Sequence, residues 1–267
     1  MLSNITSTGL TDNNLLKLEN KFSGASLSKN LESNDIHKNL AFCASPQLLK
    51  AYFLPVSFGK TNQLSVEKAK AYIKKEFNID ADFGDNLKLA NLVATGFKNL
   101  EKQNIPLKNS GLRIVCDYSV FEHRPKPLEK DGSPREVEPA LMITGENVLY
   151  FNPKFDWNNL ENRIEKNFKK GNLAYSDPVG LIYHEIGHFL HYKSNSGKYK
   201  AADQEIPSDT QKDIIQEQVS KLAVKDFGEF VAEVFAGTML GKTYSPEIQE
   251  IYKDWAYYGP DIFRIDR

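Results

Sequence analysis

The 267-residue chain is long enough for one large domain, or for a catalytic domain with a smaller N-terminal part. Its hydrophobic content of 40% can bury a sizeable core, and 34 basic against 35 acidic residues argue against a nucleic-acid partner, which needs a basic excess. No stretch of about 18 apolar residues occurs, so no membrane span is expected.

Residues 1–62 are predicted to be an irregular or partly disordered leader. Its start, MLSNITSTGLTDNN, has neither a basic region nor an apolar core, so it is no classical secretory signal peptide. The chain is therefore expected in the cytoplasm or on a specialised secretion route. The Ser, Thr and Asn content resembles the leaders of secreted bacterial effectors and toxins, and a solvated tail is the alternative.

Residues 63–104 are predicted to form a helical N-terminal region, because apolar residues recur at helical spacing over 65–77 and again over 85–102. The texture changes after 104, where the segment 105–267 combines strand and helix patterns. An α+β fold is therefore expected, with a small mixed or antiparallel sheet.

Several short elements are predicted in the first part of this segment. The β-branched and aromatic run 111–121 predicts a strand, and 123–139, with four prolines, predicts a long loop. Residues 140–144 and 147–153 predict a hairpin around Gly145. A helix is predicted over 157–170.

The segment SDPVGLIYHEIGHFLHYK, residues 176–193, predicts an amphipathic helix with an apolar stripe on one face and histidines on the other. His184 and His188 stand one turn apart, so both imidazoles can reach a single tetrahedral zinc ion. Glu185 lies beside them, where a general base can take a proton from a zinc-activated water molecule. The pattern therefore predicts a zinc site on this helix.

A catalytic zinc site needs a third protein ligand. The pattern HExxHxxGxxH is absent, because His191 stands at its Gly position and Ser194 at its final His position. Downstream, KDFGEFVAEVFAGTMLG predicts a helix over 227–240, on which Glu229 and Glu233 share one face. Two carboxylates on an apolar helix are costly to bury without a cation, so this helix is the best source of the third ligand.

The sequence HEIGH followed by EFVAE resembles the lethal-factor family of toxin metallopeptidases and similar gluzincins, including the Pro-Pro endopeptidases. The resemblance covers roughly residues 140–260 and implies a zincin-like catalytic domain over 105–267, with a metal-binding helix pair and one zinc ion per chain. It implies that Glu229 is the third zinc ligand and that Glu233 supports the site through hydrogen bonds. Leu222 departs from the family, which has an oxyanion-stabilising Tyr there; the candidates to replace it are Tyr192, Tyr252, Tyr257 and Tyr258.

Zincin folds place an edge strand beside the metal helix, and the substrate adds to it as an antiparallel strand. We expect residues 147–153 to be that edge strand, with an interior strand as an equal alternative. His191 lies one turn beyond His188 and is expected at the rim of the site or behind the ligands. His37 and His123 are expected to be ordinary surface histidines.

The sequence therefore predicts hydrolysis of a peptide bond in a protein or peptide. The alternative is a non-catalytic zinc-stabilised interaction module or phage structural module, in which a fourth protein ligand such as His191 or Asp203 would exclude water. If Glu229 is not the third ligand, the remaining candidates are Asp203, Glu205 and Glu217.

Overall fold

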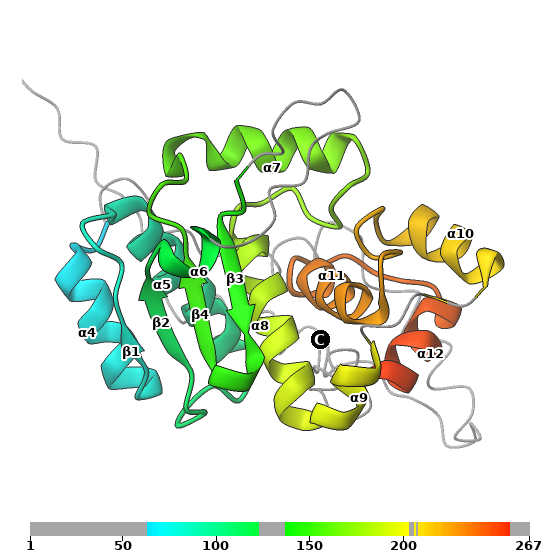
Figure 1. Cartoon of the computed structure of the whole chain (residues 1–267), viewed down its shortest axis with the longest axis horizontal. Coiled ribbons are helices and arrows are strands. Elements are labelled where there is room, and N and C mark those ends of the chain that lie inside the picture. Colours follow the sequence, from blue (N-terminus) through cyan, green and yellow to red (C-terminus); the bar gives the residue numbers. More distant parts are fainter. Residues whose placement is uncertain (1–62, 123–136, 203–205, 207, 257–267) are drawn as a thin grey trace, which may run out of the picture. The chain divides into compact units, whose positions relative to one another are not determined.

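The computed structural model describes residues 63–122, 137–202, 206 and 208–256, all within the compact unit Lys50–Arg267 (Figure 1). The fold is α+β, mostly helical with a small mixed sheet of four strands, which confirms the predicted class. Several expectations lie outside the described residues: those for the leader 1–62, for most of the loop 123–139, and for His37, His123, Asp203, Glu205, Tyr257 and Tyr258.

Two capped helices come first along the described chain. Helix α4 (Val66–Phe77) begins where the Ser65 side chain accepts a backbone N–H, and α5 (Leu87–Lys102) begins in the same way at Asn86. Both predicted helices are confirmed to within two residues at each end. They pack against each other, and α5 also packs against the helix that carries the HEIGH segment.

The sheet has the strand order β1-β2-β4-β3. The pairs β1–β2 and β2–β4 are parallel, whereas β3 and β4 form an antiparallel hairpin around the turn Thr144–Glu146, as predicted. The strand bounds are β1 (Asp80–Ala81), β2 (Arg113–Cys116), β3 (Ala140–Ile143) and β4 (Val148–Phe151).

One predicted strand is too long, and for another the interior alternative is confirmed. Of the strand expected over 111–121, only Arg113–Cys116 (β2) forms a strand. The Asp117 side chain accepts hydrogen bonds from the backbone and hydroxyl of Ser119 and so starts the short helix α6 (Ser119–Glu122). The segment 147–153 forms the interior strand that was the equal alternative to an edge strand, because β4 pairs with β3 on one side and with β2 on the other. In the described sheet, β3 is the strand at that edge.

The remaining helices follow the hairpin. The predicted helix over 157–170 is a short turn, Trp157–Asn159, continued by α7, and the two helices that carry the site motifs are α8 and α11. None of the described helices is long and apolar enough to cross a membrane. Their bounds are α7 (Leu160–Lys169), α8 (Val179–Ser194), α9 (Ser196–Ala202), α10 (Asp209–Gln218), α11 (Phe227–Met239) and α12 (Pro246–Trp255).

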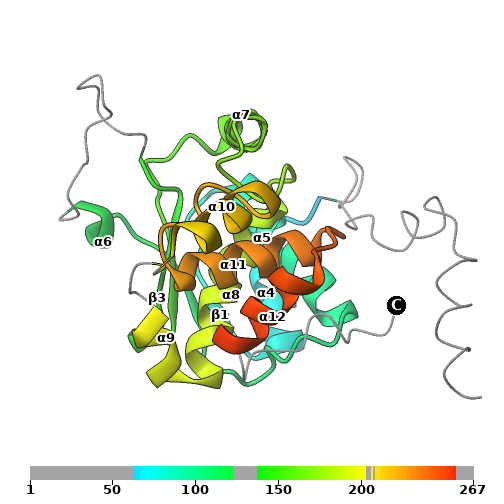
Figure 2. The same ribbon diagram turned by 90° about the vertical axis from the view of Figure 1, so that its right-hand side faces the viewer.

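Helix α8 lies at the centre of the fold, with α5 and β3 against it and α11 on its other side (Figures 1 and 2). The prediction of one buried stripe is therefore too narrow, because every residue of α8 from Val179 to His191 except His188 is buried. Helices α8 and α11 approach closely at Gly187, where a Cβ atom would lie 3.0 Å from the Ala232 Cα. A larger residue at this position would separate the two helices that carry the motifs.

Candidate metal centre

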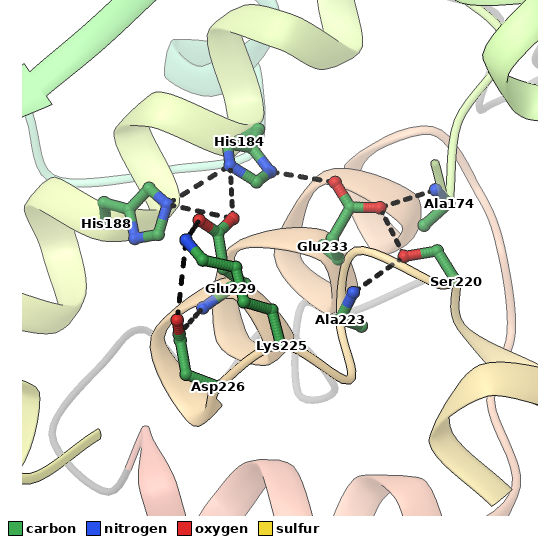
Figure 3. Close-up of polar contacts among 9 residues, drawn as sticks. All are labelled: Ala174, His184, His188, Ser220, Ala223, Lys225, Asp226, Glu229 and Glu233. Carbon is green, nitrogen blue, oxygen red and sulfur yellow. Dashed lines mark hydrogen bonds and ion pairs between the residues drawn. The ribbon is translucent and has the colours of Figure 1, made fainter. Parts of the chain in front are cut away.

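Three potential ligands converge between α8 and α11 (Figure 3). The Nε2 atoms of His184 and His188 are 3.2 Å apart, and the Glu229 Oε2 lies 3.3 Å from the first and 3.7 Å from the second. Two ligand atoms at about 2.0–2.1 Å from a tetrahedral zinc ion lie about 3.3 Å apart. The described residues therefore offer a ligand set with the spacing that a single metal ion requires.

Both helices are fixed close to these ligands. The Asp177 Oδ1 accepts the Val179 N–H at 2.9 Å at the start of α8, and the Asp226 Oδ1 accepts the Glu229 N–H at 2.8 Å at the start of α11. Asp226 is the N-cap of α11, and its side chain bonds to the backbone of Glu229 itself. The position of Glu229 is thus tied to the first turn of its helix.

Glu233 lies one turn after Glu229 and is completely buried. Its Oε1 is 2.8 Å from His184 Nδ1, and its Oε2 accepts hydrogen bonds from the Ala174 N–H at 2.6 Å and the Ser220 hydroxyl at 2.8 Å. A carboxylate at Nδ1 keeps the proton there and leaves the Nε2 lone pair for a metal ion. Neither Ser220 nor Ala174 carries a sequence signal, because both lie in irregular segments.

The charges of the ligands are coupled. Burial alone would lower the pKa of His184, but the carboxylates of Glu229 and Glu233 outweigh it and raise that pKa well above its usual range. Burial would raise the pKa of Glu229, yet contact with His184 and His188 holds it well below its usual range. These shifts favour a negatively charged Glu229 carboxylate that faces a positively charged His184 imidazole. A divalent cation could take the place of the imidazole proton.

Glu185 lies on the side of α8 that faces the sheet edge. Its carboxyl group is buried, which raises its pKa, while the two histidines and the nearby backbone N–H of Met142 act in the opposite direction. A carboxylate whose pKa is raised can take up and release a proton closer to neutral pH than an exposed one. Met142 belongs to β3, so this carboxyl group lies near the edge strand.

His188 and His191 have different surroundings from His184. The His188 Nδ1 is buried without a hydrogen-bond partner among the described residues, and the His188 ring meets the ring of Tyr199 edge-on at 6.2 Å. His191 is not part of the ligand group and is buried against Tyr199 at 5.3 Å. Burial lowers the pKa of His191 to about 4, although the backbone carbonyl of Trp255 acts in the opposite direction.

Other predicted candidates lie elsewhere. Glu217 is exposed on α10 and does not belong to the ligand group. Tyr192 packs edge-on against Tyr199 at 5.6 Å, and Tyr252 is buried in α12. Leu222 is partly buried, in the turn before α11.

Lys225 lies near the ligands, although no sequence pattern singles it out. Its ammonium is 3.1 Å from the Glu229 Oε1, whereas Oε2 is the oxygen that approaches the histidines.

Comparison with models of known protein families, with curated proteins and with solved structures found no significant match. The interpretation of the site therefore depends on its geometry and on the two motifs.

Proposed function

We propose that the chain is a zinc-dependent metallopeptidase of the gluzincin kind, with a zincin-like catalytic domain. His184, His188 and Glu229 would hold one zinc ion, and Glu185 would act as the general base. The observation that carries the proposal is the convergence of the three ligand atoms at tetrahedral spacing, next to a buried carboxylate.

The donor set favours zinc and a catalytic rather than a structural site. Two imidazoles and a carboxylate are typical zinc ligands, and catalytic sites have three protein ligands with a fourth position open. Among the described residues, only His184, His188 and Glu229 form such a group. A structural site would have no use for a carboxylate at the position of Glu185.

Zinc in such a site polarises a carbonyl group and lowers the pKa of a coordinated water molecule toward about 7. Glu185 would take the proton of the attacking water and deliver it to the leaving amine. Glu233 would keep the His184 ring in one tautomer and orientation, supported by the hydroxyl of Ser220. The remaining contribution of the chain is to place the substrate beside Glu185.

The sheet edge supports a peptide as the substrate. The Asn152 N–H donates to the Pro139 carbonyl at 2.9 Å, so the backbone of Pro139 faces β4. Because hydrogen-bonded and non-hydrogen-bonded pairs alternate along an antiparallel hairpin, the backbone groups of Ala140 and Met142 point away from β4. The Met142 backbone N–H, which lies on this outer side of β3, is close enough to the Glu185 carboxyl group to lower its pKa. An extended peptide added to β3 would therefore pass close to the metal site.

The experiment measures zinc content and peptide cleavage in parallel for the native chain, Glu229→Ala and Glu185→Gln. We expect about one zinc ion per native chain, a large loss in Glu229→Ala, and retention in Glu185→Gln. Cleavage of a peptide library should be at least about 100-fold slower in Glu185→Gln, because a general base typically accelerates a reaction by about 10²–10⁴-fold.

Each other outcome is informative. Full zinc retention in Glu229→Ala would move the third ligand to Asp203 or Glu205, since Glu217 is exposed on α10 outside the ligand group. One zinc ion with a fourth protein ligand and no cleavage of any peptide would favour the non-catalytic module. A native chain that binds no zinc after reconstitution would refute the proposed function.

A further inference from the structure

The two oxygens of the Glu229 carboxylate have different partners (Figure 3). Oε2 faces the Nε2 atoms of His184 and His188, at 3.3 Å and 3.7 Å. Oε1 accepts a hydrogen bond from the Lys225 ammonium at 3.1 Å. One oxygen is thus directed to the metal position and the other is held by a cation.

This ion pair differs from an ordinary surface pair with the same spacing. Lys169 and Glu165 on α7 are also four residues apart, and their side chains are 70% and 56% exposed. Glu229 is only 17% exposed, whereas Lys225 is 63% exposed, so the ammonium reaches a mostly buried carboxylate from the solvent side. An exposed pair contributes little to stability, but a contact with a buried ligand can fix its orientation.

The position of Lys225 is set by the turn that leads into α11. Its backbone N–H donates to the Leu222 carbonyl at 3.1 Å. The neighbouring Asp226 caps the helix through Oδ1, which accepts the Glu229 N–H, while its Oδ2 lies 3.7 Å from the Lys225 ammonium. The same turn therefore holds the backbone of Glu229 and one of its carboxylate oxygens.

We infer that Lys225 is a positioning residue that makes Glu229 a one-oxygen ligand. A carboxylate can bind a metal ion through one oxygen or through both, and the second mode occupies an additional coordination position. Because Lys225 engages Oε1, only Oε2 is presented to the metal, and the position that a reacting molecule needs is kept open. The inference rests on the proposed metal site but not on peptide cleavage.

The test uses Co²⁺ in place of zinc in the full-length chain, because the visible absorption of Co²⁺ is much stronger in four-coordinate than in five- or six-coordinate sites. The native chain, Lys225→Met, Lys225→Arg and the control Lys169→Met are compared at equal cobalt occupancy. Lys169→Met removes an i,i+4 ion pair without touching the ligands. Circular dichroism checks that each variant is folded.

We expect intense absorption in the native chain and in Lys169→Met, loss of most of it in Lys225→Met with one metal ion still bound, and recovery in Lys225→Arg. Lys225→Met with native absorption would overturn the inference, as would equal losses in Lys225→Met and Lys169→Met. A native chain with the weak spectrum of a higher coordination number would also overturn it. If the native chain binds neither cobalt nor zinc, the metal site itself fails, which is distinguishable from every other outcome. If Lys225→Met does not fold, Lys225→Arg provides the test. Strong absorption in folded Lys225→Arg would agree with a cation that holds Oε1, and weak absorption would contradict it.

Discussion

The two ends of the histidine row on α8 differ in a way that burial does not explain. His184 and His191 are both buried, yet the pKa of His184 is raised well above its usual range and that of His191 is lowered to about 4. His184 lies between the carboxylates of Glu229 and Glu233, whereas His191 packs edge-on against the ring of Tyr199. Desolvation lowers the pKa of both imidazoles, and only nearby negative charge reverses the shift.

The difference indicates which end of the helix could hold a cation. A site that holds a protonated imidazole between two carboxylates can exchange that proton for a metal ion, because the carboxylates stabilise either positive charge. A neutral histidine among aromatic rings has no such compensation. Substitutions at each end of the helix test this difference.

The largest effect is expected from Glu233→Ala, at the polar end of the row, where His184 lies between two carboxylates. The substitution leaves three buried donors without an acceptor: His184 Nδ1, the Ala174 N–H and the Ser220 hydroxyl. Each unsatisfied donor costs about 1–3 kcal/mol, so we expect the free energy of unfolding to fall by at least about 3 kcal/mol. Zinc affinity should fall about 10–100-fold, the usual effect of losing a hydrogen-bond partner of a metal ligand.

Urea unfolding and chelator competition measure the two quantities. Thr238→Val is the matched control, because the Thr238 hydroxyl on the same helix is buried without a described hydrogen-bond partner. It should leave zinc affinity unchanged and should not lower the free energy of unfolding, because it removes a buried hydroxyl that has no described partner. Unchanged zinc affinity in Glu233→Ala would show that the buried carboxylate is not needed to orient His184.

At the aromatic end of the row, where His191 packs against Tyr199, His191→Leu should make the free energy of unfolding of the metal-free chain fall less as the pH is lowered. The folded-state pKa of His191, about 4, lies below its unfolded value of about 6.5, so its contribution to stability is complete above pH 6.5 and is lost as the pH falls toward 4. Between pH 7 and pH 5 this loss amounts to about 2 kcal/mol.

Urea unfolding of the metal-free native chain and of His191→Leu at pH 7 and pH 5 tests this expectation. The native chain should lose about 2 kcal/mol more than the variant between the two values. The His184 site acts in the opposite direction, since a raised pKa adds stability as the pH falls, but it is common to both proteins and cancels in the difference. Equal pH dependence in the two proteins would mean that His191 titrates normally.

Local features of this architecture could be predicted from the sequence, and long-range ones could not. The helix starts at Ser65 and Asp226 and the β3–β4 hairpin follow from short patterns of capping residues, apolar spacing and turn residues. The sequence left an edge place and an interior place equally open for β4, because the choice depends on parallel pairing with β2 across more than thirty residues of sequence. The full burial of α8 likewise depends on what packs on its second face.

The same division holds within the candidate site. The HEIGH segment identifies His184, Glu185 and His188 through helical spacing, and the resemblance points to Glu229 and Glu233. The residues that support these side chains lie in turns, where no periodic pattern indicates which way a side chain points. Ser220 and Lys225 both belong to the turn that precedes α11, so the sequence alone gave no reason to select them.

Ser220→Ala should produce the smallest of these effects and isolates one hydrogen bond of the polar end. Glu233 keeps the Ala174 N–H and His184 as partners, but it loses the Ser220 hydroxyl, and the Ala223 N–H loses its acceptor. We expect the free energy of unfolding to fall by about 1–2 kcal/mol and zinc affinity to fall less than in Glu233→Ala. Ser245→Ala is the matched control, because it removes the hydroxyl that caps α12 at a similar cost of about 1 kcal/mol and touches no ligand. Weaker zinc binding in Ser220→Ala but not in Ser245→Ala would show that the contact tunes the metal site through Glu233, whereas equal zinc affinities would restrict Ser220 to a role in stability.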